Sequence, residues 1–253
     1  AAIASLADLA AYDDQPALIS LLERVTDRQE KAELQRALAA AAMKADDPEK
    51  RSAVITGALD KSSARLLLIP VLARTGGTEA LKRVCDEFEN GNAETRDVCF
   101  DALAHWNDHS ALKALLEICA SGNKTFGMPA FDAYLRMVST ASVTPERKLL
   151  FIKDIAPYAF SPDARTEMIS LAASLKIRQA EFFISRYLSD TDEGVRMAAA
   201  DAIKSMNLPA NETFVPIFNG KDLAGWKGLV GNPLTRAAMK PAEKAAKQKE
   251  ADE

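Results

Sequence analysis

The chain has 253 residues, a formal net charge of −4 and 48% apolar residues. This length is enough for one large or two small domains with a sizeable core. The negative balance excludes a nucleic-acid groove, which needs a concentrated basic face, and no apolar run reaches the roughly 18 residues of a transmembrane helix. Aromatic residues are scarce at 6%, and a chain rich in Ala and Leu is typical of packed helices.

A repeat runs through residues 1–207. Its two clearest copies begin at Asn92 and Asp192, and each of these lies four residues before an arginine, Arg96 or Arg196. Looser copies are anchored at Lys31, Arg65, Gly127 and Arg165. Neighbouring anchors are 31 to 38 residues apart. A period of this length indicates stacked supersecondary units, none of which can bury its apolar face alone.

Apolar residues at helical spacing predict two helices in each unit. Glycines separate the helices, and a capping side chain precedes proline at three of the predicted starts, Asp47, Thr144 and Ser161. The predicted helix pairs are 2–11 with 16–25, 28–44 with 49–59, 62–74 with 78–89, 93–106 with 109–120, 125–140 with 145–157 and 162–175 with 177–188, followed by a lone helix at 192–206.

The repeat length and its best motif resemble HEAT-like repeats. The Asp-x-x-Val-Arg-x-x-Ala-x-x-Ala-Leu signature of that class is matched by Asp192, Val195, Arg196, Ala199, Ala202 and Ile203. The resemblance implies an all-α fold, a right-handed α-α superhelix or ARM-type solenoid over residues 1–207. It implies an architecture and no particular activity, because most such arrays are binding or spacing scaffolds.

Two histidines, His105 and His109, lie four residues apart, a spacing that binds zinc on a continuous helix. Asn107 and Asp108 between them predict a turn, so we expect a solvent-facing corner. The cysteines lie among apolar residues and are predicted to be buried, unpaired thiols: Cys85, Cys99 and Cys119.

Three arginines, Arg65, Arg96 and Arg196, recur in register. We expect each of them to pair with an acidic side chain of a neighbouring repeat, and a track that binds an anionic ligand is the alternative. The repeats contain no glycine-rich phosphate-binding loop. They also contain no sequence motif that places a serine or cysteine nucleophile beside a histidine, so we expect neither catalysis nor a cofactor or metal there.

A partner protein or domain is the ligand that the repeats predict. HEAT-like arrays usually line their concave face with the second helix of each pair. Positions there that lie off the apolar stripe are Lys82, Arg83, Asp86, Lys113, Glu117, Arg178, Phe182 and Arg186. An exposed Phe182 would be a contact candidate, and a half-buried Phe182 is the alternative.

The pattern changes after the repeats. Residues 208–213 form a linker, 214–218 alternate as a short strand does, and Asn219-Gly220 is a strong turn dipeptide. This run resembles the opening of the 3-keto-disaccharide hydrolase domain family. The matching residues are Phe218, Asn219, Gly220, Lys221, Asp222, Leu223, Gly225 and Trp226.

The second resemblance implies a concanavalin-like jelly roll that acts on oxidised glycosides in bacterial secreted or envelope proteins, so we expect a periplasmic or secreted location. It covers only the first strand and turn of that family. We therefore interpret 214–253 as a truncated N-terminal piece within an excised segment, with a polar helix from residue 232 and with no catalytic role carried to any residue.

Together these patterns predict a HEAT-like scaffold or binding module attached to a glycoside-processing domain, with a carbohydrate reached through that domain. The alternative is that the repeat helices contribute directly to the sugar site. We also expect the apolar side of the 192–206 helix to be left partly open at the end of the array and to be covered by 214–226.

Overall fold

The computed structural model describes residues 5–209 and 233–252, and these residues are helical with short connections and no strand. The chain divides into two compact units, Ala1–Leu208 and Pro209–Glu253. The all-α prediction is thus confirmed for the described residues. The strand predicted at 214–218 and the motif at 218–226 lie outside them.

Most predicted helices of the first unit are confirmed within a few residues at each end. The α-helices are α1 Leu6–Leu9, α2 Gln15–Arg24, α3 Arg28–Ala42, α4 Pro48–Ala58, α5 Arg65–Thr75, α6 Thr78–Asn90, α7 Ala93–Ala104, α8 Leu112–Ala120, α9 Gly127–Thr140, α10 Pro145–Ile155, α11 Pro162–Ser174, α12 Arg178–Ser185 and α13 Glu193–Met206. Short 3-10 turns accompany them, namely η1 Tyr12–Asp14, η2 His109–Ala111, η3 Ala156–Tyr158 and η4 Arg186–Ser189.

Side-chain caps fix many of these helix starts. The predicted caps Asp47, Thr144 and Ser161 each accept a hydrogen bond from a backbone N–H in the first turn. Asn92 and Asp192 do the same at the two clearest repeat copies. The helix predicted at 2–11 is the exception, because within the described residues α1 is confined to Leu6–Leu9 and extended backbone follows it.

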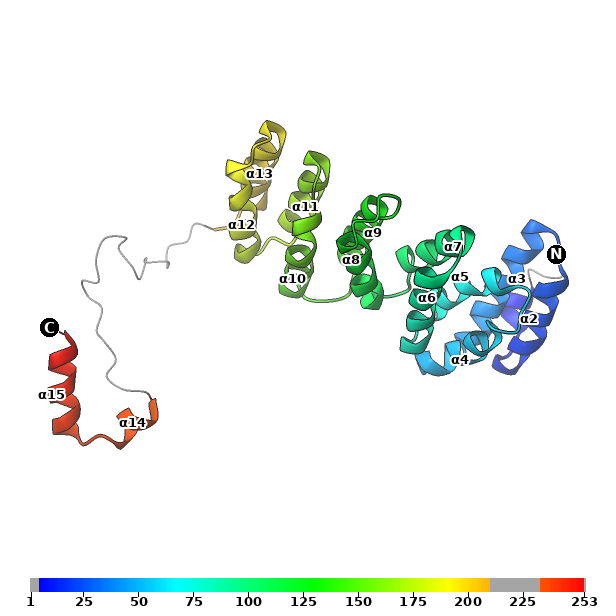
Figure 1. Ribbon diagram of the computed structural model, residues 1–253, viewed down its shortest axis with the longest axis horizontal. Helices are drawn as coiled ribbons and strands as arrows, with labels where there is room; N and C mark the ends of the chain where they lie inside the picture. Colours follow the sequence, from blue (N-terminus) through cyan, green and yellow to red (C-terminus); the bar gives the residue numbers. More distant parts are fainter. Residues whose placement is uncertain (1–4, 210–232, 253) are drawn as a thin grey trace. The chain divides into compact units, whose positions relative to one another are not determined.

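The helices pack in chain order (Figure 1). Each first helix contacts the next first helix, from α3 through α5, α7, α9 and α11 to α13. Among the second helices, α2 packs on α4, α4 on α6 and α10 on α12. One apolar core runs from Ala10 to Met206, and the alanines of α3 let α5 approach closely, because Ala37 and Ala41 are both fully buried.

The prediction of neighbouring-repeat ion pairs for the arginines is wrong. Arg65 pairs with Glu87 on α6, the partner of its own helix α5. Arg96 donates to the backbone carbonyl of Glu89, 3.0 Å away, and Arg196 donates to that of Asp190, 2.9 Å away. The latter two side chains reach back to the segment just before their own helix, where carbonyl groups lack helical partners.

The apolar side of α13 at the end of the unit is partly covered. Helix α13 packs on α11, α12 and η4, so that Val195, Ala199 and Met206 are buried, while Ala202 and Ile203 are half-buried. Residues 214–226, which the sequence predicts to cover this helix, lie outside the described residues.

The second unit contributes α14 Pro233–Ala238 and α15 Pro241–Asp252. The polar helix predicted from residue 232 is therefore two helices, and the break comes just before Pro241, where proline restricts the preceding residue. Glu243 and Lys247 form an ion pair of 2.9 Å one turn apart on α15. Among the described residues, no helix combines the length and the apolarity needed to cross a membrane.

Candidate functional site

Helices α6 and α8 border a cavity of about 140 Å³, which we call the α6/α8 cavity. Its lining residues are Cys85, Phe88 and Glu89 of α6, Leu103 of α7, Ala114, Glu117 and Ile118 of α8, and Ser121 just after α8. The first helices α5 and α7 pack closely, whereas α6 and α8 approach each other less closely. Sites for drug-sized ligands have roughly 300–1,000 Å³, so this cavity has room for one side chain.

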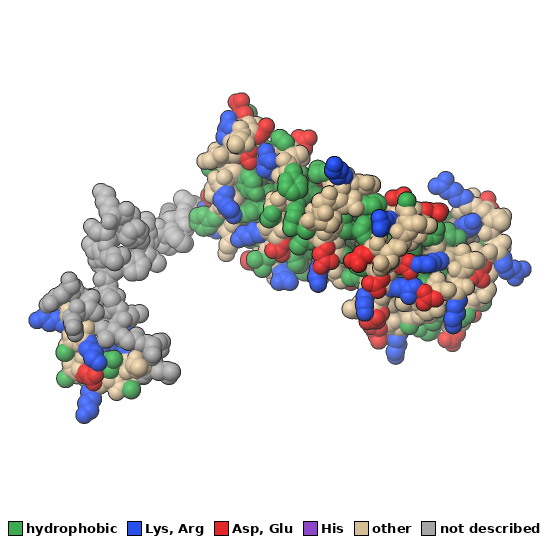
Figure 2. All heavy atoms as spheres, viewed as in Figure 1, with side chains coloured by type: hydrophobic (Ala, Val, Ile, Leu, Met, Phe, Trp, Pro, Cys, Tyr) green, Lys and Arg blue, Asp and Glu red, His purple; other side chains and the backbone are tan. Residues whose placement is uncertain are grey.

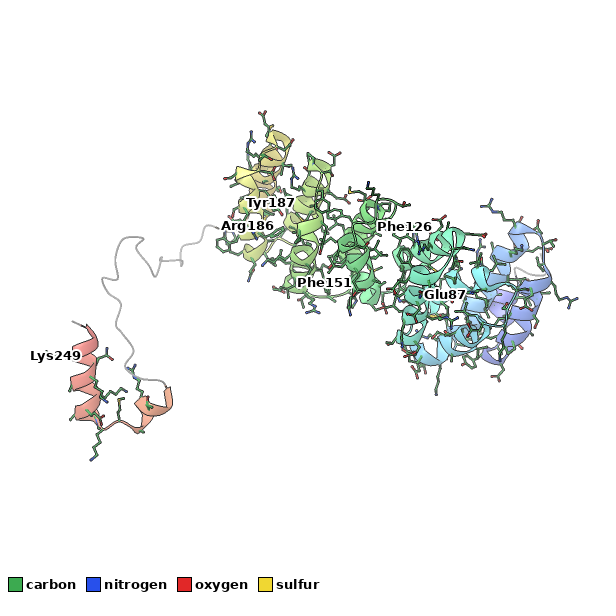
Figure 3. All side chains as sticks on the ribbon, viewed as in Figure 1. Glu87, Phe126, Phe151, Arg186, Tyr187 and Lys249 are labelled. Atoms are coloured by element: carbon green, nitrogen blue, oxygen red, sulfur yellow. The ribbon has the colours of Figure 1, made fainter. Side chains whose placement is uncertain are left out.

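Aromatic packing fixes one wall of the cavity. The Phe88 ring lies edge-on to that of Phe126, with centroids 5.3 Å apart, and Phe126 in turn lies 4.9 Å from Phe100. Phe126 immediately precedes α9 (Figure 3), so three consecutive pairs supply these rings. Such pairs stabilise a defined ring orientation, and Phe88 is therefore held in place at the cavity.

A contact between repeats fixes the start of α6. Gly76 and Gly77 have φ angles of 73° and 103°, which favour glycine, and Gly77 offers no capping side chain. The Glu49 carboxylate of α4 accepts hydrogen bonds from the Thr78 and Glu79 N–H groups instead. The bond from Thr78 is the main reason why the pKa of Glu49 is lowered. One helix thus caps the corresponding helix of the next pair.

A charged cluster anchors the middle of α6. Glu87 is only 6% exposed (Figure 3) and pairs with Arg65 of α5 and, at 3.0 Å, with Arg83. Arg83 also pairs with Asp60, and this hydrogen bond is the main cause of a lowered pKa for Asp60 and a raised one for Arg83. Each cation has an acidic partner, so the cluster satisfies a buried carboxylate and presents no open anion site.

Both helices contribute an acidic side chain to the α6/α8 cavity, Glu89 from α6 and Glu117 from α8. Burial raises the pKa of the Cys85 thiol to about 11, and Glu117, Asp86 and Glu89 raise it further through their charges. The thiolate is the nucleophilic form of cysteine. At neutral pH this thiol is therefore protonated and unsuited to covalent catalysis.

The prediction of unpaired thiols is confirmed, since Cys85, Cys99 and Cys119 are free. Cys99 and Cys119 are buried and Cys85 is half-buried. Burial is also the main reason why the pKa values of the other two thiols are raised, to about 12 for Cys99 and about 11 for Cys119.

The histidine pair forms the predicted corner. His105 is exposed at the end of α7, and its Nδ1 lies 3.2 Å from a carboxylate oxygen of Asp101. His109 is exposed in η2, and its ring lies 6.0 Å from that of Phe151 (Figure 3). Within the described ranges, no group of three or more His, Cys, Asp or Glu side chains is placed to hold a metal ion.

Five of the predicted binding residues lie on α6 and α8, namely Lys82, Arg83, Asp86, Lys113 and Glu117. Lys82 is exposed, and Arg83 belongs to the Glu87 cluster. Lys113 and Glu117 form an ion pair of 3.7 Å with both side chains largely in solvent, and Glu117 also lines the α6/α8 cavity. An exposed pair of this kind adds little stability, so Glu117 can exchange its partner readily.

The other three predicted residues lie on a separate surface. Arg178 and Phe182 are on α12, and Arg186 is in η4 (Figure 3). Arg178 forms an ion pair with Glu181, Phe182 is 55% exposed and Arg186 is exposed. Because α8 and α10 separate α12 from α6 in the stack (Figure 1), the structure does not bring these residues to the α6/α8 cavity.

Charges of both signs interleave over the visible face of the first unit (Figure 2). This arrangement favours local charge pairing over a long track of one sign. A binding site on this unit therefore has to be built from a local feature such as the α6/α8 cavity.

Sequence reasoning missed the apolar part of this cavity. The sequence predicts Cys85 to be a buried thiol and indicates no binding role for Phe88, Ala114 or Ile118. Their spacing carried no signal for a cavity, because an apolar side chain that faces a gap between helices has the same periodicity as one that faces a neighbour.

Comparisons with protein-family models, curated proteins and solved structures found no match for this chain.

Proposed function

We propose that the first unit is a HEAT-like solenoid scaffold that binds a partner protein through the surface of α6 and α8. The same scaffold would position a glycoside-processing domain, whose opening the run at 214–226 resembles. The observation that carries the binding role is the α6/α8 cavity, an apolar hollow with carboxylates from two consecutive repeats.

Packing supports the scaffold role. Successive first helices contact each other throughout the unit, and the side chain of Glu49 reaches from α4 to cap α6. The contacts between first helices recur along the chain, as they do in a solenoid. A stack held by such contacts can present a fixed surface.

Chemistry favours binding over catalysis at this site. The Cys85 thiol stays protonated at neutral pH because its pKa is raised, and the two arginines nearest to Glu87 are engaged with acidic side chains. The cavity therefore offers shape, apolar contact and negative charge, which are the elements of non-covalent recognition.

Site-specific photo-crosslinking tests the partner-binding role. A photoreactive residue would replace Lys82 or Lys113 on the proposed surface, and Asp97 on the exposed side of the first helix α7 would be the matched control. We expect the first two positions to crosslink to one shared protein in cells that make this chain naturally, and position 97 to give none. Equal crosslinking from all three positions would contradict the proposal.

A sugar titration separates this role from the alternative site. We expect a 3-keto-glucoside to leave the methyl NMR signals of α6 to α12 unchanged. Shifts confined to those helices would favour a direct contribution of the repeats to the sugar site.

A further inference from the structure

We propose that the α6/α8 cavity receives an arginine side chain of the partner protein. The methylene stem would lie against Phe88 and Ile118, and the guanidinium would lie at Glu89 and Glu117. This inference rests on the proposed function and adds to it the chemistry of the partner, a basic segment with an arginine available for insertion.

The size and lining of the cavity require a long, partly apolar occupant. At about 140 Å³, it is below the range for drug-sized ligands and suits a single side chain. Leu103 is buried, and Phe88, Ala114 and Ile118 add further apolar surface. A short polar group would leave this surface without contacts, whereas a methylene stem covers it.

The charge of the cavity requires a cation at the end of that stem. Glu89 comes from α6 and Glu117 from α8, so the carboxylates belong to two different walls. Asp86 adds to the negative charge felt at Cys85. Lys113 forms an exposed ion pair of 3.7 Å with the lining residue Glu117, and an incoming cation can compete with a pair of this strength.

Arginine fits these features better than lysine does. A guanidinium is planar, is less strongly hydrated than an ammonium and stacks on aromatic faces. It also donates from several N–H groups at once, so it can serve carboxylates on two walls. The fixed Phe88 ring and the two glutamates offer both kinds of contact.

The test uses the full chain and four small probes of similar length. These probes are n-butylguanidinium, n-butylammonium, neutral n-pentanol and anionic pentanoate. Methyl NMR of Ala114 and Ile118 reports binding at the cavity, and the buried Ile55 of α4 is the reference. We expect n-butylguanidinium to saturate with a Kd on the order of 1–10 mM, butylammonium to bind more weakly, and pentanoate not to bind.

Matched variants assign the effect to the cavity. Glu89→Gln and Glu117→Gln should each weaken n-butylguanidinium binding by roughly threefold to tenfold. Glu94→Gln, an exposed residue in the first turn of α7 that does not line the cavity, should leave the affinity unchanged. Ala114→Leu should fill the cavity and abolish binding, and an unchanged Ile55 signal would show that the variant is folded.

Two results would overturn the inference. One is the absence of saturable shifts at Ala114 and Ile118 with n-butylguanidinium, and the other is equal affinity for n-pentanol, which would mean that the carboxylates play no part. If either result occurs while crosslinking from positions 82 and 113 is retained, this inference fails and the proposed function stands.

Discussion

Arginine has a recurring structural role four residues after a helix N-cap. Side chains at this position reach back and donate to backbone carbonyls of the segment that precedes their own helix. The residues are Arg51 of α4, Arg96 of α7, Arg165 of α11 and Arg196 of α13. Carbonyl groups in the last turn of a helix or in a connection lack helical partners, and the guanidinium carries several donors in a fixed plane. For Arg96, Arg165 and Arg196, the register that the sequence reveals thus reflects a repeated local hydrogen bond, whereas Arg65 forms an ion pair with Glu87.

Arg51 offers a direct test of this role. Its Nε lies 2.6 Å from the Ala45 carbonyl oxygen and its Nη2 lies 3.0 Å from that of Asp46. We expect Arg51→Met to lower the free energy of unfolding by about 1–2 kcal/mol, because both carbonyls lose a charged donor. Urea unfolding followed by circular dichroism measures the change.

The control is Arg36→Met on the exposed side of α3, which should change the free energy of unfolding by less than about 0.5 kcal/mol. Arg51→Lys should lose part of the stability, because lysine keeps the positive charge but lacks the planar set of N–H donors of the guanidinium. Equal losses from Arg51→Met and Arg36→Met would contradict the structural role.

Individual helices are linked across repeats by side chains as well as by the core. The Glu49 carboxylate of α4 supplies the missing cap of α6, and Asp60, just after α4, pairs with Arg83 of α6. These contacts set where α6 begins and hold its outer face. They therefore also fix one wall of the α6/α8 cavity.

The cap that Glu49 provides should depend on pH. Glu49→Ala should lower the free energy of unfolding by about 1 kcal/mol at neutral pH, as the loss of a capping acceptor does. The folded-state pKa of Glu49 is lowered from 4.5, so its contribution is present above 4.5 and is lost as the pH falls through the lowered value.

Urea unfolding of the wild type and of Glu49→Ala at about pH 7 and about pH 3 measures this dependence. The stability difference should shrink at the lower pH. Asp97→Ala, an exposed carboxylate in the middle of α7, is the control and should show a small difference at both values. A Glu49→Ala difference that stays constant would mean that the charge of Glu49 does not act as the cap.

Local signals in the sequence made the helices predictable. Contacts between residues far apart in the sequence could not be predicted in the same way. Asp47, Thr144 and Ser161 identified helix starts because a cap and its partner lie within one turn. The capping role of Glu49 could not be predicted, because its partners lie about 30 residues away in the sequence. A different limit applied to Arg96, whose register is visible in the sequence but whose partner is a backbone carbonyl, which side-chain identity does not reveal.

The candidate site was predictable only in its charged part. Glu117 was identified because it lies off the apolar stripe of its helix, and it does line the α6/α8 cavity. The apolar lining depends on how closely α6 and α8 approach, which is set by the packing of whole pairs. Helix periodicity contains no information about that distance.

At the scale of the whole molecule, the apolar core of the first unit extends along the chain and is not concentrated around one central point. Buried side chains from Ala10 to Met206 form a continuous cluster, and each pair is covered mainly by its neighbours in the stack. Stability in such an arrangement is the sum of many interfaces between neighbours. Damage to a central pair therefore weakens two interfaces at once.

Because stability is distributed in this way, we expect one buried leucine of α8 to contribute more to the stability of the first unit than the whole terminal segment does. Leu115 is fully buried, so Leu115→Ala should cost roughly 2–5 kcal/mol and lower the Tm by roughly 4–20 °C. Deleting residues 232–253 should change the Tm little, because they belong to the second compact unit. Leu150→Ala on α10, where the side chain is 49% exposed, is the matched control and should cost much less than Leu115→Ala. A larger loss of Tm from the deletion than from Leu115→Ala would mean that the terminal segment, and not the contacts between neighbouring pairs, holds the first unit together.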